Sequence, residues 1–215
     1  MKYSAIVFDL DGTLINTLED LMNSVNFALE KCNFPKKNID EIRRFAGNGV
    51  KKLVYLSTPE STSEETKEEC LRIFKEHYTK HSCDKTAPYN GINEMLETVK
   101  AMGIKTAVVT NKMQEAAVDI ITNFFGSYID VIIGQIDGVA QKPAPDGVLL
   151  AMNKLEALPE ETVYIGDSEV DCATAHNAAL PIIGCTWGFR ERKVLEENKA
   201  EYIINEPKEI IGIIK

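Results

Sequence analysis

Alternating strand-like and helix-like segments through residues 91–215 are the feature that most restricts the fold of this chain. Apolar runs typical of buried strands occupy residues 104–110, 129–134, 162–166, 181–185 and 202–204. Segments with helical apolar spacing lie between them, at residues 92–102, 113–125, 143–157 and 169–179, and a last helix is expected after Pro207. Strands that alternate with helices predict a parallel sheet covered on both faces. We therefore predict an α/β fold with a Rossmann-like, doubly wound parallel sheet.

A helical segment interrupts this pattern near its beginning. Residues 3–9 form one more apolar run that suits a buried strand, but mostly helical signals follow. The predicted helices cover residues 17–32, 38–47, 48–57 and 61–81. We expect a Rossmann-like core made of residues 1–15 and 86–215, interrupted by an all-helical cap domain of residues 16–85.

Composition and charge exclude several classes of partner. The 215-residue chain carries a net charge of −9, which argues against non-specific nucleic-acid binding. No stretch approaches the roughly 18 apolar residues of a membrane span, and the first residues do not read as a signal peptide.

The cysteines are odd in number and scattered: Cys32, Cys70, Cys83, Cys172 and Cys185. We expect free thiols and a cytoplasmic monomer or homodimer.

Polar residues follow four of the predicted strands. They are Asp9, Thr110 with Asn111, Lys142 on the loop after residues 129–134, and Asp167 with Asp171. Ligands of open α/β sheets bind beyond the carboxyl ends of the strands, so these side chains are expected to converge. A single aspartate at a strand end is commonly a helix cap. A whole set of them at one sheet edge favours a functional site.

The residue types at this edge suit the transfer of a phosphoryl group. Converging carboxylates repel one another unless a cation lies among them, and Mg²⁺ prefers such oxygen ligands together with substrate phosphate. The Thr110 hydroxyl, the Asn111 backbone N–H and the Lys142 ammonium can hold phosphate oxygens. Asp9 and Asp11 point to the same side of an extended chain, so one can attack phosphorus while the other transfers protons. Mg²⁺ and Lys142 are expected to offset the charge of both aspartates.

The order of these motifs resembles a known family. "DLDGTL" (9–14), "VVTNK" (108–112), "KPAPDG" (142–147) and "GDSEVD" (166–171) resemble the four motifs of the haloacid dehalogenase superfamily. The helical insert looks like the small cap of its phosphoglycolate phosphatase-like branch, as do residues 45–54, 86–92 and 187–207. Asn16, Thr17 and Asn90 depart from the residues that are common in that branch, and Asn16 could alter cap closure.

The resemblance implies a Mg²⁺-dependent phosphatase that hydrolyses small phosphomonoesters through an aspartyl-phosphate. It implies that Asp9 is the nucleophile and that Asp11 protonates the leaving oxygen and then activates water. The metal would be held by the Asp9 carboxylate, the Asp11 backbone carbonyl and Asp167. The phosphoryl group would be bound by Thr110, Asn111 and Lys142. Asp171 would orient Lys142 or a metal-bound water.

The predicted cap offers two candidate features for substrate selection. Gly47, Asn48 and Gly49 could bring backbone N–H groups to the far end of a substrate, or could simply be a helix end followed by an N-cap. Four cations flank them: Arg43, Arg44, Lys51 and Lys52. These cations could attract a short anionic substrate such as 2-phosphoglycolate, or could be ordinary surface charges.

Three other hypotheses remain open at this stage. A phosphomutase or a pyrophosphatase of the same fold would use the same core motifs. A phospho-accepting receiver domain is disfavoured by the chain length, by the helical insert and by Asp11.

His77 and His81 have a spacing that can bind zinc, with Cys83 nearby, but they lack an adjacent glutamate. We expect them on an exposed helix face.

Overall fold

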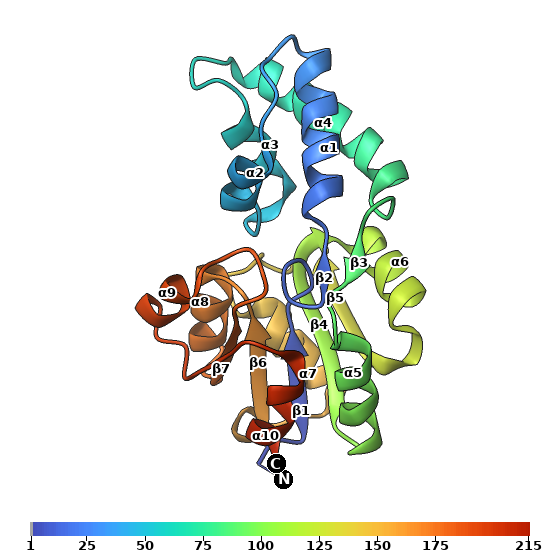
Figure 1. Cartoon of the computed structure of the whole chain (residues 1–215), viewed down its shortest axis with the longest axis vertical. Helices are drawn as coiled ribbons and strands as arrows, with labels where there is room; N and C mark the ends of the chain where they lie inside the picture. Colours follow the sequence, from blue (N-terminus) through green and yellow to red (C-terminus); the bar gives the residue numbers. More distant parts are fainter. Residues whose placement is uncertain (1) are drawn as a thin grey trace. The chain divides into compact units, whose positions relative to one another are not determined.

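Two compact units make up the chain in the computed structural model, which describes residues 2–215. The first unit contains the described residues up to Ile15 together with Pro88–Lys215, and the second unit is Asn16–Ala87. The segments that connect them form a short two-stranded sheet of β2 (Ile15–Asn16) and β3 (Ala87–Pro88). Figure 1 labels the elements of both units.

A six-stranded sheet forms the centre of the first unit. Its strands are β1 (Ala5–Phe8), β4 (Lys105–Met113), β5 (Val131–Gln135), β6 (Thr162–Gly166), β7 (Ile182–Cys185) and β8 (Tyr202–Ile204). They lie in the order β5-β4-β1-β6-β7-β8, and every neighbouring pair is parallel. The predicted parallel α/β sheet is therefore confirmed, and its earliest strand lies in the middle (Figure 1).

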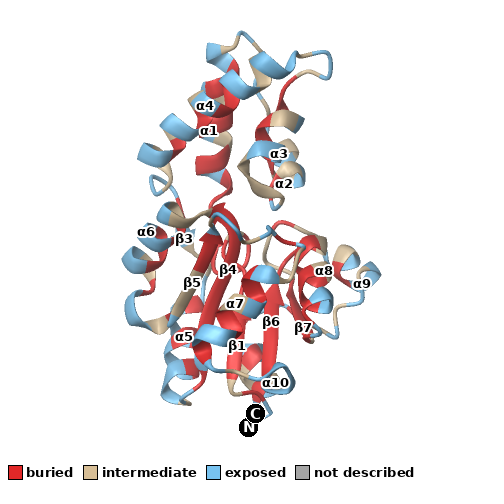
Figure 2. Cartoon of the chain, turned by 180° about the vertical axis from the view of Figure 1, so that it is seen from behind, coloured by how far each residue is buried: buried red, intermediate tan, exposed pale blue. Residues whose placement is uncertain are grey.

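Helices cover both faces of this sheet because both faces of its strands are apolar. On β1, Ile6 and Phe8 belong to one buried cluster, whereas Ala5 and Val7 belong to the other. The first cluster is covered by α5 (Ile92–Ala101), α6 (Gln114–Phe124) and α10 (Ile210–Ile214). The second is covered by α7 (Asp146–Leu155), α8 (Glu169–Asn177) and α9 (Arg192–Glu197). The buried strands are red in Figure 2.

Strand register brings the polar motifs to one edge. Phe8, the last residue of β1, lies opposite Val108 of β4 and Ile165 of β6. The next residue, Asp9, donates its backbone N–H to the Ile165 carbonyl at 2.8 Å. The residues that follow Val108 and Ile165 therefore emerge beside Asp9 at the carboxyl end of the sheet.

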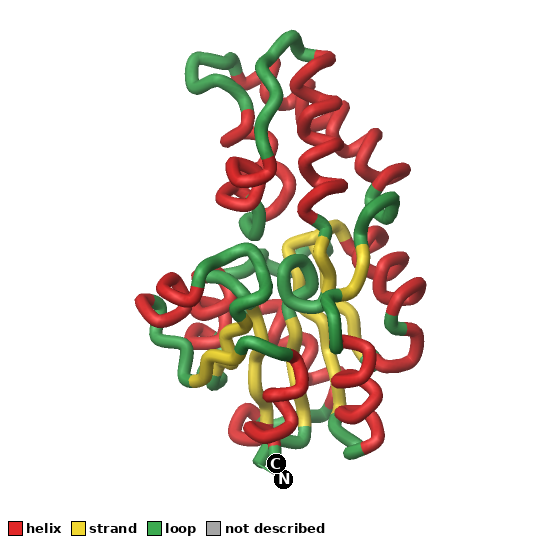
Figure 3. Tube along the Cα trace, in the orientation of Figure 1, coloured by secondary structure: helices red, strands yellow, loops and turns green. Residues whose placement is uncertain are grey.

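The described part of the second unit contains four helices, and Figure 3 draws the helices of both units in red. They are α1 (Leu18–Lys31), α2 (Ile39–Phe45), α3 (Gly49–Ser57) and α4 (Glu64–His81). The long helices α1 and α4 pack together. His77 of α4 is partly buried in this packing, where it stacks on Phe27 of α1 and bonds Ser24 Oγ at 3.0 Å. The expectation that His77 lies on an exposed face is therefore wrong.

The prediction that all five cysteines carry free thiols is also wrong. A disulfide joins Cys32 and Cys70, whose Cα atoms lie 6.4 Å apart. Cys32 follows the last residue of α1 and Cys70 lies in α4, so the packing of these helices brings together residues 38 positions apart. Sequence spacing alone does not reveal this contact. Cys83, Cys172 and Cys185 remain free thiols.

Polar contacts hold both ends of the helical unit. The Asp20 carboxylate accepts hydrogen bonds from the backbone of Lys85 and from the backbone and hydroxyl of Thr86, at 2.8–3.0 Å. Asn16 Oδ1 accepts the backbone N–H of Leu18 at 3.2 Å, and so holds the first turn of α1. Within residues 2–215, none of the helices combines the length and the apolar character that crossing a bilayer requires.

Candidate active site

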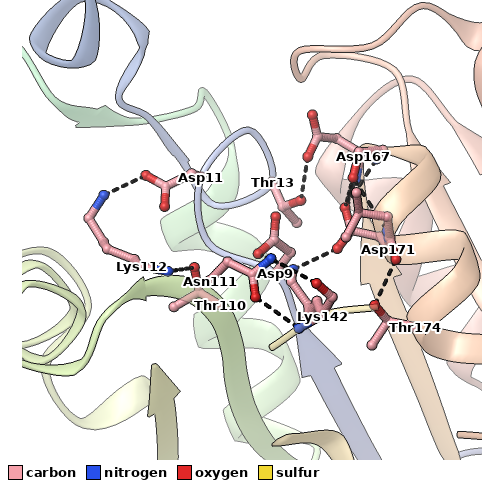
Figure 4. Close-up of polar contacts among 12 residues, drawn as sticks. Asp9, Asp11, Thr13, Thr110, Asn111, Lys112, Lys142, Asp167, Asp171 and Thr174 are labelled. Carbon is pink, nitrogen blue, oxygen red and sulfur yellow. Dashed lines mark hydrogen bonds and ion pairs between the residues drawn. The ribbon is translucent and has the colours of Figure 1, made fainter. Parts of the chain in front are cut away.

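The Lys142 ammonium forms the centre of the polar cluster at the sheet edge (Figure 4). Its Nζ lies 2.6 Å from Asp9 Oδ1 and 2.7 Å from Asp171 Oδ1, and donates to the Tyr164 hydroxyl at 3.1 Å. Its side chain is only 4% exposed. Burial lowers the pKa of Lys142, but Asp171 and Asp9 outweigh burial and raise that pKa well above its usual value. Lys142 is therefore a buried cation shared by two carboxylates.

Asp171 is held by contacts on both of its oxygens. Oδ1 accepts from Lys142 and from the Tyr164 hydroxyl, the latter at 3.1 Å. Oδ2 accepts from the backbone of Asp167 and Ser168 and from the Ser168 hydroxyl, the last at 2.6 Å. Ser168 and Asp171 form the capping box of α8, so the helix start fixes this carboxylate. The arrangement aims Asp171 at the Lys142 ammonium.

Asp167 is positioned by backbone that approaches it closely. Its Oδ2 accepts the backbone N–H of Phe189 at 2.6 Å, and its Oδ1 accepts the Thr13 hydroxyl at 3.3 Å. A Cβ at Gly12 would lie 2.5 Å from Asp167 Oδ2, and one at Gly188 would lie 2.4 Å from Asp167 Cβ. Gly12 also has a φ of +96°, which side chains rarely adopt. The two glycines therefore make room for this carboxylate.

Three carboxylates converge here in a way that suits a divalent cation. Oxygen atoms of Asp9, Asp167 and Asp171 all lie within 4.8 Å of one another, and all three residues are buried. Burial, and then the charge of Asp171, raise the pKa of Asp167 to about 7. Grouped carboxylates of this kind are the hard oxygen ligands that divalent cations bind.

Asn111, at the sheet edge, contacts the backbone of Lys142 through both polar atoms of its side-chain amide. Its amide Nδ2 donates to the Lys142 carbonyl at 3.1 Å, and its Oδ1 accepts the Lys142 backbone N–H at 2.9 Å. This reciprocal pair ties the end of β4 to the loop before α7. Thr110 Oγ1 lies alongside and accepts the Lys112 backbone N–H at 3.2 Å.

Asp11 has a different cationic partner from the one that we expected. Its Oδ1 lies 2.8 Å from Lys112 Nζ, and the side chain of Lys112 is only 3% exposed. We expected Mg²⁺ and Lys142 to offset both aspartates; of the two, Lys142 pairs with Asp9, and Asp11 has the additional partner Lys112. The signal was present in the sequence, since Lys112 directly follows Thr110 and Asn111 at the end of a predicted strand.

The candidate substrate-binding residues of the helical unit lie around the start of α3. Gly47 and Gly49 both have positive φ angles, and Asn48 is the N-cap residue of α3. The Asn48 side chain does not cap the helix, but accepts from Lys52 Nζ at 3.3 Å. Of the flanking cations, Arg43 pairs with Asp40 and Lys51 pairs with Glu68, each at 2.6 Å on the surface. These two cations are therefore engaged in surface ion pairs.

A family model described as haloacid dehalogenase-like hydrolase matches residues 6–185, which is most of the chain. The chain belongs to this family. A candidate pyrophosphatase, PpaX of Caldanaerobacter subterraneus, is 31% identical over all of this hydrolase and 96% of its own length. A phosphoglycolate phosphatase of Pasteurella multocida is 28% identical over all of this chain and 99% of its own.

Solved structures share the fold of this hydrolase over its whole length. The crystal structure of a candidate phosphoglycolate phosphatase from Lactobacillus delbrueckii aligns with a TM-score of 0.94 and 31% identity. The alignment covers 100% of this chain and 99% of that one. The Rossmann-like fold with its helical insert is therefore that of the haloacid dehalogenase-like hydrolases.

Tyr164 is a site residue that the sequence motifs did not reveal. It lies inside strand β6, where an apolar run suggests only core packing, yet its hydroxyl contacts both Lys142 Nζ and Asp171 Oδ1. We expect Tyr164→Phe to lower kcat of this hydrolase several-fold, because one net hydrogen bond contributes about 1 kcal/mol. Steady-state kinetics against Tyr128→Phe, a tyrosine outside the cluster, measures this effect. Equal kcat values for the two variants would contradict a role for the hydroxyl.

Proposed function

We propose that this hydrolase is a Mg²⁺-dependent phosphatase of small phosphorylated metabolites, most similar in activity to phosphoglycolate phosphatases. The observation that carries the proposal is the buried group of Asp9, Lys142 and Asp171 beside Asp167. A carboxylate and a cation held together at a sheet edge suit attack on a phosphoryl group and binding of its oxygens. We also propose that the hydrolase acts in the cytoplasm and that its oligomeric state is a monomer or a homodimer.

Two aspartates divide the chemistry between them in this proposal. An Asp9 carboxylate oxygen forms a bond to phosphorus while the bond from phosphorus to the leaving oxygen breaks, and Asp11, which is protonated when substrate is bound, gives its proton to that oxygen. Asp11 then takes a proton from water, whose oxygen bonds to phosphorus as the bond from phosphorus to Asp9 breaks. Inorganic phosphate leaves and both aspartates return to their starting states.

The remaining residues hold the phosphoryl group and keep the nucleophile in place. Thr110, Asn111 and Lys142 would bind its oxygens, and the Asn111 amide fixes the backbone that carries Lys142. Asp171 and Tyr164 orient the Lys142 ammonium toward Asp9. Because these contacts exist before substrate arrives, little reorganisation is needed when charge develops during transfer.

The donor set fits the metal ion that the proposal requires. The Asp9 carboxylate, the Asp11 backbone carbonyl and Asp167 would hold Mg²⁺, and Asp171 is already engaged by Lys142 and α8. When bound, Mg²⁺ neutralises charge on the carboxylates and on the phosphoryl oxygens. Without a cation, the raised pKa of Asp167 leaves this carboxyl partly protonated near neutral pH.

This proton binding predicts how metal stabilisation depends on pH. The pKa of Asp167 is about 7 in the folded protein, whereas an unfolded aspartate titrates near 3.9. Between these values the folded state binds more protons, so Asp167 makes the metal-free protein less stable as pH rises toward 7. Mg²⁺ must displace that proton, so we expect it to raise Tm more at pH 8 than at pH 5.5.

Differential scanning calorimetry with EDTA or saturating MgCl₂ measures this dependence. At about 100-fold excess over its Kd the ion should stabilise by about 2.7 kcal/mol at the higher pH. Asp167→Asn should abolish most of the metal-induced shift, while Asp137→Asn, on an exposed loop, should leave it intact. A metal-induced shift equal at both pH values would contradict the assignment of Asp167.

The identity of the substrate is proposed from the relatives and from the charges of the helical unit. Relatives named phosphoglycolate phosphatase favour a small carboxylated phosphomonoester. We propose that Gly47, Asn48 and Gly49, together with the four flanking cations Arg43, Arg44, Lys51 and Lys52, read its carboxylate. Pyrophosphate is a second candidate, because the relative PpaX is named a candidate pyrophosphatase.

A substrate panel with EDTA controls tests the proposed function. We expect Mg²⁺-dependent phosphate release, with kcat/KM for 2-phosphoglycolate above that for neutral sugar phosphates and for pyrophosphate. Replacing Arg43, Arg44, Lys51 and Lys52 by glutamine should lower that preference, and an unchanged ranking of substrates would contradict a role for these cations. A higher kcat/KM for pyrophosphate would favour the second candidate, and activity undiminished by EDTA would overturn the metal-dependent mechanism.

A further inference from the structure

Two neighbouring aspartates of this site are each paired with their own buried lysine. Lys142 comes from the loop before α7 and binds Asp9, whereas Lys112 comes from the end of β4 and binds Asp11. In Figure 4 the Asp11 and Lys112 side chains point toward one another, apart from the group of Asp9, Lys142 and Asp171. The second pair is not needed to hold Asp9, so it calls for a separate explanation.

Lys112 is placed by an irregular stretch of backbone. The pairing of β4 with β5 shifts register between Val109 and Met113, and the Lys112 N–H donates to Thr110 Oγ1 rather than continuing a regular ladder. The Lys112 side chain is 3% exposed, and that of Asp11 is 17% exposed. An ammonium this deeply buried is stable only beside a compensating group, so the ion pair restricts both side chains.

We propose that Lys112 is a positioning residue that acts through Asp11. Its ammonium holds the Asp11 carboxyl group at the side of the site from which it reaches the leaving oxygen and later the attacking water. This inference rests on the proposed function, in which Asp11 gives a proton to the leaving oxygen as the bond from phosphorus to that oxygen breaks. Lys112 itself touches neither substrate nor metal and transfers no proton.

Leaving-group dependence separates this role from a purely structural one. p-Nitrophenyl phosphate releases a stable phenolate that needs little help from an acid, whereas an alkyl phosphate such as glycerol phosphate releases an alkoxide that needs a proton. Asp11→Asn should lower kcat/KM for the alkyl ester by roughly 10²-fold or more, in line with the loss of a general acid, and much less for the aryl ester. Lys112→Met should reproduce this pattern with a loss of roughly 10-fold or more on the alkyl ester.

A double-mutant cycle tests whether Lys112 acts through Asp11. In the Asp11→Asn background, Lys112→Met should change kcat/KM by less than about three-fold, because residues that act as a unit are not additive. Lys105→Met, the same substitution at the other end of β4, is the matched control and should leave kcat/KM for both substrates unchanged. Circular dichroism melting verifies folding, and Lys112→Gln replaces Lys112→Met if the latter unfolds.

The outcomes distinguish failure of this inference from failure of the proposed function. The positioning role would be overturned if Lys112→Met lowered kcat/KM equally for both esters. It would also be overturned if Lys112→Met lowered kcat/KM as much in the Asp11→Asn background as in the unmodified protein. If Asp11→Asn itself shows no leaving-group dependence, the assignment of Asp11 fails and the proposed mechanism fails with it. A substrate-dependent loss for both single variants together with non-additivity supports the inference.

Discussion

Asp9→Asn is expected to lower kcat by at least ~10³-fold, because an amide oxygen is a far weaker nucleophile than a carboxylate. The expectation is strengthened by the position of Asp9, which Lys142 holds at 2.6 Å at the end of the central strand. Phosphate release under saturating Mg²⁺ measures the loss, and acid quenching with labelled substrate measures the phosphoenzyme.

The controls for this variant separate chemistry from folding. Asp137→Asn makes the same chemical change on an exposed loop and should retain full activity. Asp9→Asn should also fold normally, since the Lys142 ammonium keeps Asp171 as its partner. Near-normal turnover of Asp9→Asn would rule out the aspartyl-phosphate mechanism.

Lys142→Ala is expected to lose both activity and stability. Its removal takes away the cation beside the phosphoryl group, which should lower kcat by roughly 10²-fold or more. It also leaves Asp9 and Asp171 buried without their shared cation, and breaking a buried pair in this way costs about 3–5 kcal/mol.

Urea unfolding and steady-state kinetics measure the two effects of Lys142→Ala separately. Lys154→Ala removes an exposed lysine from α7 and should change neither quantity appreciably. Because the lost stability comes from uncompensated carboxylates, adding Asp171→Asn to Lys142→Ala should restore part of it. A stable but inactive Lys142→Ala protein would mean that its ammonium contributes to binding but not to the fold.

Local patterns in the sequence were enough to predict the fold. Strand and helix signals depend on the spacing of apolar residues along the chain, and the alternation through residues 91–215 allows few arrangements other than a parallel sheet. The expected convergence of Asp9, Lys142, Asp167 and Asp171 followed from the same argument, because parallel strands end at one edge. Motif order then indicated the family.

Pairings between distant segments were decided only by the tertiary structure. Cys32 and Cys70 look unrelated along the chain, and become bonded because α1 and α4 lie together. Tyr164 looks like a core residue until its hydroxyl is seen beside Lys142. Both contacts depend on which helices and strands pack against one another. Apolar periodicity predicts which face of an element is buried, but not which other element covers that face.

The two aspartates of "DLDGTL" show this division most clearly. From the sequence alone both could be predicted to lie at the carboxyl edge of a parallel sheet, where like charges need compensation, but the extended chain predicted for them ends at Phe8 and turns from Leu10 onward. Which cation compensates which carboxylate depended on the register of β4 and on the path of the loop before α7. Lys112 is 101 positions from Asp11, and Lys142 is 133 positions from Asp9. Only the folded sheet brings these lysines within ion-pair distance of the two aspartates. The packing of the buried strands fixes where each strand ends, and so fixes where each charged side chain emerges.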